Sequence, residues 1–196
     1  MKEITLPSPV CTGGMPLRDA LMARRSMRTY SERRFDLNDA NDLQLLSDLL
    51  WAAFGPVSAR RRSAPSSHNR QETELYVLLP EGVFVYDATT EGCRLVPVGD
   101  KDLRAASGAQ DYVGTAAMEI AFVADTTKVT GKSPRGLVET IYVDTGFISE
   151  NIYLFCASEG LATVVRAMVP KDTLAAALGL APTREITLVQ TVGWAR

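Results

Sequence analysis

One long stretch of the sequence, residues 136–161, limits the possible folds more than any other. It reads GLVETIYVDTGFISENIYLFCASEGL, and apolar residues occupy nearly every side of the helix that it predicts. A helix that is apolar all round has to be buried all round. In a chain of 196 residues, this predicts a helix at the centre of the fold or across a subunit interface. Gly146 would allow a close backbone approach there, either within one chain or between two.

Three shorter helices are predicted on either side of this stretch. The first covers residues 15–25. The second follows the sequence FDLNDANDL, with Asp36 or Asn38 as its N-cap, and ends at Gly55. The last covers residues 171–180.

Several runs rich in β-branched residues predict strands. They cover residues 74–79, 83–87, 93–98, 119–125 and 185–194. Strands and helices in this order are typical of the α+β fold class, with a central mixed or antiparallel sheet flanked by helices. We expect one domain over residues 1–196, which begins with an extended arm over residues 1–14.

Composition argues against several functional classes. The 21 Lys and Arg residues nearly balance the 23 Asp and Glu residues, for a formal net charge of -2, which argues against a nucleic-acid partner. The three cysteines form no CxxC motif and His68 is the only histidine, so we expect neither a disulfide framework nor a metal site. No apolar run approaches the roughly 20 residues of a membrane span. The N-terminus has no apolar signal segment, and we expect a cytoplasmic protein.

Positive charge is concentrated in the sequence LMARRSMRTYSERRF, residues 21–35. Guanidinium groups grip phosphate through paired hydrogen bonds, and a serine hydroxyl adds a short neutral donor. In an extended segment, Arg24, Ser26 and Arg28 would face the same side and one anionic ligand. The alternative is that these arginines end a helix, where they complement its dipole and stay solvated.

A second polar segment, APSSHNRQ, covers residues 64–71. The Asn69 amide offers both a donor and an acceptor, which suits the edge of a heterocycle. The alternative is an ordinary turn, because Pro, Ser and Asn all favour turns. The preceding triplet Arg60–Arg62 is either an anchor for a partner protein or solvated loop charge.

Together these segments resemble the nitroreductase family. RRSMRTYS and PSSHN are similar to its N-terminal arginine signature and its Pro-Ser-Ser-x-Asn loop. NIYLFCASEGLATVVRAM, residues 151–168, resembles its long central helix and the following turn, and VGW resembles its C-terminal end. Within the family, the chain looks closest to a compact bacterial subgroup near the thiazole/oxazole-forming peptide oxidases.

The resemblance implies an FMN-binding homodimer with FMN at the subunit interface. Arg24 and Ser26 would bind the phosphate and ribityl chain, and Arg28 would lie by the pyrimidine end of the ring. The other implied cofactor-binding residues are Ser67 and Asn69 from the partner subunit, the backbone of Val165, Arg166 and Ala167 near flavin N5, Arg196 at the phosphate, and Arg25 in a less definite role.

The implied activity is transfer of hydride or electron pairs from NADH or NADPH to a nitroaromatic, quinone or similar conjugated acceptor, by a ping-pong cycle. No side chain stands out as an acid, base or nucleophile, which fits chemistry carried by the flavin. Two alternatives are a flavin-binding protein without nicotinamide-dependent turnover and an FMN-dependent oxidase or dehydrogenase of a peptide-like substrate. The sequence departs from the resembled pattern at Glu72 and Ala195, where proline is usual, and at the pair Ala167-Met168.

Overall fold

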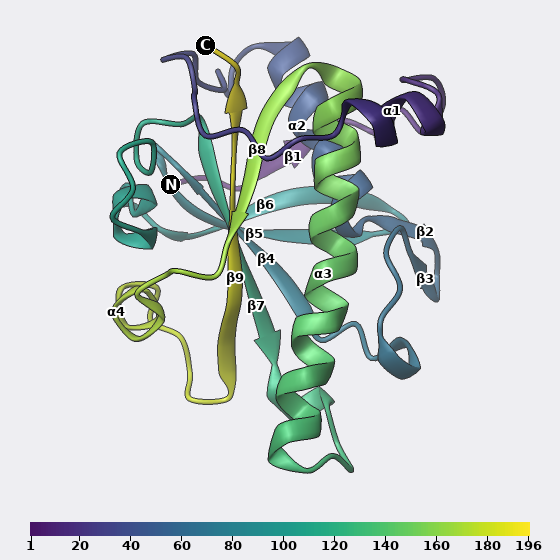
Figure 1. The fold of residues 1–196 in the computed structure, drawn as a ribbon, viewed down its shortest axis with the longest axis vertical. Coiled ribbons are helices and arrows are strands. Elements are labelled where there is room, and N and C mark those ends of the chain that lie inside the picture. Colours follow the sequence, from purple (N-terminus) through teal and green to yellow (C-terminus); the bar gives the residue numbers. More distant parts are fainter.

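A seven-stranded antiparallel sheet forms the centre of the computed structural model, which describes residues 1–196 (Figure 1). Its strand order is β1-β6-β5-β4-β7-β9-β8. The strands are β1 (Ile4–Leu6), β4 (Thr73–Leu79), β5 (Gly82–Thr89), β6 (Gly92–Gly99), β7 (Met118–Asp125), β8 (Leu161–Arg166) and β9 (Arg184–Trp194). The expected α+β fold class is confirmed, and the sheet is antiparallel throughout.

Four helices and several short elements complete the fold. The helices are α1 (Leu17–Ala23), α2 (Ala40–Phe54), α3 (Pro134–Glu159) and α4 (Lys171–Ala177). β2 (Pro56–Ser58) and β3 (Arg61–Arg62) form a separate two-stranded sheet. Three 3-10 turns are η1 (Ser67–Asn69), η2 (Arg104–Ser107) and η3 (Thr126–Lys128). No helix of the structure is both long and apolar enough to span a bilayer.

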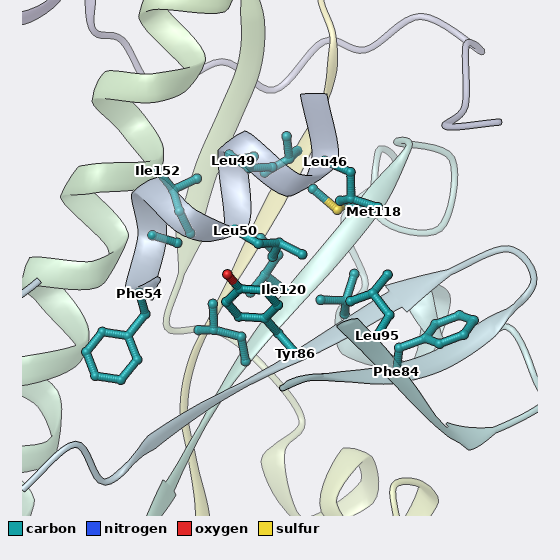
Figure 2. Close-up of a cluster of buried hydrophobic side chains, with 14 of the residues drawn as sticks. Leu46, Leu49, Leu50, Phe54, Phe84, Tyr86, Leu95, Met118, Ile120 and Ile152 are labelled. Atoms are coloured by element: carbon teal, nitrogen blue, oxygen red, sulfur yellow. The ribbon is translucent and has the colours of Figure 1, made fainter. Parts of the chain in front are cut away.

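The sheet has helices on both faces. On one face, α2 and α3 enclose the main hydrophobic core, in which Leu46, Leu50, Ile120 and Ile152 have no exposed surface (Figure 2). On the other face lie α4 and the segment around η2, where Leu174 belongs to a smaller buried cluster (Figure 1). Burial of these large aliphatic side chains supplies most of the favourable free energy of folding.

Helix α2 begins one to three residues later than the sequence predicts. The Asp39 carboxylate accepts hydrogen bonds from the backbone N–H groups of Asn41 and Asp42 at 2.9 and 3.0 Å, so Asp39 is the N-cap. The prediction of Asp36 or Asn38 as the cap is wrong. The Asp36 carboxylate instead accepts the Asn38 backbone N–H in the preceding turn.

Helix α3 is buried on one face only. Ile141, Ile148 and Ile152 have no exposed surface, whereas Val143 and Phe147 are 57% and 48% exposed. The expectation of burial on all sides is therefore wrong for a single chain, because nothing in that chain covers the outer face. Gly146 of this helix fits the same picture: apart from its neighbours and the backbone of the helix itself, no atom of the chain lies within 4 Å of the position that a Cβ would occupy. Gly146 therefore does not provide a packing notch within one chain.

Candidate functional site

The arginine-rich segment leaves helix α1 and runs along the edge of the sheet. The Met27 N–H donates to the Thr163 carbonyl at 2.9 Å, and Tyr30 pairs with Ala195 in an isolated antiparallel bridge. Helix α1 ends at Ala23, and Arg24 already has extended backbone angles (φ -53, ψ 124). Arg25 and Arg28 therefore lie outside the helix, as the interpretation of these residues as a ligand-binding segment requires.

Tyr153 on α3 brings three parts of this region together. Its hydroxyl lies 2.9 Å from Ser26 Oγ and accepts a hydrogen bond from the Val165 N–H at 3.0 Å. The Arg24 guanidinium lies over its ring, 5.3 Å from the centroid. The sequence did not single out Tyr153, because it reads there as one more apolar residue of the long helix.

The arginines of the segment point to different surroundings. Arg24 is partly exposed, and its Nε lies 4.0 Å from the Glu150 carboxylate. Arg28 is exposed and lines an open hollow of about 530 Å³ together with Tyr30 and Tyr112. Arg25 lines a separate pocket of about 260 Å³, whose wall includes Tyr153. The segment thus places Arg24 and Arg25 near Tyr153 and Arg28 at the open hollow.

Arg166 turns its side chain into the interior. Its Nη2 lies 2.6 Å from the Glu119 carboxylate, and its Nη1 donates to the Ser107 carbonyl at 2.8 Å. Glu119 is fully buried and also accepts the Thr191 hydroxyl at 2.9 Å. Burial raises the pKa of the Glu119 carboxyl to about 7 against the opposing effect of Arg166. The Arg166 guanidinium is therefore held within the core by these partners.

The backbone N–H groups on either side of Arg166 differ in their partners. The Val165 N–H is already donated to Tyr153. Ala167 lies one residue beyond the end of β8, is exposed, and its N–H has no partner in the protein. Of the backbone donors that the sequence pointed to, Ala167 offers the free one.

The Asn69 loop is held beside the middle of α3. The Ser67 N–H donates to Asp144 Oδ2 at 2.7 Å. The Asn69 Nδ2 donates to the Arg60 carbonyl at 2.8 Å, and its Oδ1 accepts from Gln71 Nε2 at 3.0 Å. The Asn69 Nδ2 can therefore donate one more hydrogen bond and its Oδ1 can accept one more, so both remain available to a ligand.

Within one chain, the arginine segment and the Asn69 loop stay apart. They contact α3 through Tyr153 and Asp144, which are nine positions apart in the helix. At 1.5 Å per residue, that is about 14 Å along its axis. No hydrogen bond or ion pair of the chain joins the two segments.

The fold also places Arg196 and the arginine triplet at residues 60–62. Arg196 is exposed and directly follows Ala195, which pairs with Tyr30 of the arginine segment. In the triplet before the Asn69 loop, Arg62 donates to Gln71 Oε1 and to the Phe54 carbonyl, both at 3.1 Å. Arg62 thus supports that loop from within the chain.

Comparisons with known sequences show the family of the chain. The family model described as the nitroreductase family matches residues 21–194. A protein of Methanocaldococcus jannaschii that carries the name nitroreductase is 30% identical over 176 residues, which cover 83% of this chain and 82% of that protein.

Solved structures give the same result. A nitroreductase crystal structure from Ralstonia eutropha JMP134 superposes with a TM-score of 0.90 and 35% identity, covering 100% of this chain and 90% of that one. A Parabacteroides distasonis structure with the name NADH dehydrogenase/NAD(P)H nitroreductase has a TM-score of 0.63 at 19% identity, over 91% of this chain and 86% of that chain, which shows the shared fold. With a family model over most of its length and relatives of this similarity, the chain belongs to the nitroreductase family of oxidoreductases.

Proposed function

We propose that this oxidoreductase binds FMN and uses it to pass electron pairs from NADH or NADPH to a nitroaromatic, quinone or similar conjugated acceptor, in a ping-pong cycle. The observation that carries the proposal is the cluster around Tyr153, where Arg24, Ser26 and the end of β8 meet. We further propose that residues 1–196 act as one FMN-binding domain.

The donors at this cluster fit the chemistry of FMN. Arg24 is a permanent cation whose one carboxylate neighbour, Glu150, lies at the outer limit of an ion pair. The Ser26 hydroxyl is exposed and adjacent, which suits a phosphate or a ribityl hydroxyl. Arg196 extends the same edge as a second phosphate contact, and Arg25 has a supporting place in the pocket beside Tyr153.

The remaining residues would orient the ring. When bound, FMN supplies two-electron transfer between a reduced donor and an oxidised acceptor. Arg28, beside the open hollow, would face the pyrimidine end and stabilise negative charge there. The free N–H of Ala167 would donate to the N5 edge. No side chain of this set has to act as an acid or a base.

We propose that the active unit is a homodimer. The outer face of α3, with Val143 and Phe147, is exposed in one chain, and so are Leu17, Leu21 and Met22 of α1. A second copy that covers these apolar side chains would remove them from water. It would also bring the Ser67 and Asn69 of one subunit toward the arginine segment of the other, which one chain alone keeps apart.

The direct test uses the purified protein with added FMN, followed by anaerobic mixing with NADH or NADPH. We expect a yellow protein whose flavin absorbance is bleached by one of the two donors and restored by a quinone or nitroaromatic compound. Bleaching by neither donor would favour the flavin-binding protein without nicotinamide-dependent turnover, or the oxidase of a peptide-like substrate. Failure to take up any flavin would contradict the proposal itself.

A more specific prediction concerns Arg28. Replacing it by alanine removes a fixed cation beside the ring, so the reduced, anionic flavin loses stabilisation. We expect the midpoint potential of the bound flavin to fall by about 30 mV, which corresponds to about 1.4 kcal/mol for two electrons. Spectroelectrochemistry measures this directly, with Arg135→Ala on the exposed surface of α3 as the matched control. An unchanged potential would reject the role given to Arg28.

A further inference from the structure

A buried carboxyl group lies directly behind the Asn69 loop. Glu72 precedes β4, has no exposed surface, and neither of its carboxylate oxygens accepts a hydrogen bond from a protein donor. After burial, the carboxyl group of Asp144 on α3 is the neighbour that most raises the pKa of the Glu72 carboxyl, through a hydrogen bond between the two. Asp144 is itself 3% exposed and accepts the Ser67 N–H at 2.7 Å.

Two carboxyl groups in this position need a proton between them. If both were ionised, neither could donate, and two negative charges would face each other away from water. With one proton on Glu72, its O–H can donate to Asp144, whose Oδ2 also accepts the Ser67 N–H. Burial, and then the neighbouring Asp144, raise the pKa of Glu72 to about 7.

The cations around Glu72 are engaged elsewhere. Arg70 in the loop donates to Ser67 and to the Thr130 carbonyl. Lys128 of η3 donates to the Gln71 carbonyl, and Arg62 of β3 donates to the Gln71 side chain. On β7, the Asp125 N–H donates to the Glu72 carbonyl, while the Asp125 carboxylate faces Thr127 and Arg184. None of these groups contacts a carboxylate oxygen of Glu72.

The loop in front of this pair has a strained backbone. His68, Asn69 and Gln71 all have positive φ values of 55, 53 and 50 degrees, which non-glycine residues adopt at a cost of order 1 kcal/mol each. Such a conformation persists only where its surroundings hold it. The hydrogen bond from Ser67 to Asp144 ties this loop to α3, so the state of Asp144 affects where Asn69 is presented.

We propose that Glu72 and Asp144 share one proton and are positioning residues for the flavin site, because together they hold the Asn69 loop in its strained, binding-competent conformation. This inference rests on the proposed function for its flavin partner, but the shared proton concerns this chain alone. Loss of the proton places a second negative charge beside Asp144, which releases the loop and weakens its hold on the ring edge of FMN.

The test compares the wild-type protein with Glu72→Gln over about pH 5.5 to about pH 9. For the wild type, we expect the FMN dissociation constant to rise about tenfold from about pH 6 to about pH 8.5. In Glu72→Gln, the carboxamide donates to Asp144 at every pH, so affinity should stay at the low-pH value. Glu72→Leu, which leaves Asp144 without that donor, should bind FMN more weakly across the whole range.

A second readout needs no flavin. The pKa of Glu72 in the folded protein lies above its ordinary value of 4.5, so the stability that its proton contributes is complete below about pH 4.5 and is lost as pH rises to about 7. The thermal midpoint of the flavin-free wild type should therefore fall across this window relative to Glu72→Gln. Glu139→Gln, at an exposed carboxylate of the same helix, is the control and should follow the wild type.

The outcomes separate the inference from the proposed function. Equal pH dependence of FMN binding in the wild type and Glu72→Gln would overturn the positioning role while leaving the flavin enzyme intact. Parallel thermal midpoints in the two proteins would overturn the shared proton. A wild type that binds no FMN at any pH, yet shows the thermal difference, would instead contradict the proposed function and keep the proton pair.

Discussion

Arg166→Met is expected to lower the free energy of unfolding by about 3–5 kcal/mol, the typical effect of removing one partner from a buried ion pair. Glu119 would then be left with only the Thr191 hydroxyl as a hydrogen-bond donor, in a position with no exposed surface. The Ser107 carbonyl would lose its donor as well. Equilibrium denaturation with guanidinium chloride measures this loss.

Two further variants make the measurement specific to the pair. The double variant Arg166→Met with Glu119→Leu should be more stable than Arg166→Met alone, because it leaves no unpaired charge in the core. Glu139→Gln, which breaks the exposed pair with Arg135, should change stability by less than about 1 kcal/mol. If the double variant is as unstable as the sum of its single changes, the two residues do not act as a pair.

The second large effect is expected at Arg24, the proposed contact of the FMN phosphate. Arg24→Met should weaken FMN binding by about 10- to 100-fold, because a hydrogen bond to a charged group contributes about 1.5–3 kcal/mol. Riboflavin lacks the phosphate, so its affinity should hardly change in the same variant. Fluorescence titration with both flavins compares the two constants directly.

Arg18→Met is the matched control for this prediction. Arg18 lies on the exposed surface of α1 and takes part in no ion pair, so its replacement removes the same charge at a distance from Tyr153. It should leave both affinities near the wild-type values. An equal loss of FMN and riboflavin binding in Arg24→Met would show that Arg24 supports the fold of the site and does not recognise the phosphate.

The sequence predicted those features that depend on neighbours in the chain. Apolar periodicity located α3 and the strands because burial of one face repeats over several turns or alternate residues. The N-cap of α2 was misplaced because Asp36, Asn38 and Asp39 are all good caps, and the choice among them depends on the turn that precedes the helix.

The sequence did not predict how distant residues meet at the site. The contact of Tyr153 with Ser26 joins residues 127 positions apart, and that of Asp144 with Ser67 joins residues 77 positions apart. Tyr153 and Asp144 stand within the apolar pattern of α3, and nothing in the neighbouring sequence indicates their distant partners. Glu72 gave a partial signal, since it stands where the resembled pattern has proline.

The pairing of the arginine segment with the far end of the chain has a consequence for biosynthesis. The Met27 N–H donates to the Thr163 carbonyl and Tyr30 pairs with Ala195, so the basic segment finds these partners only after residues 163 and 195 have left the ribosome. Until then, this arginine-rich segment has neither of its contacts with β8 and the residue after β9. The proposed uptake of FMN would therefore follow the synthesis of these residues, and a product that ends before Thr163 would lack both anchors of the segment.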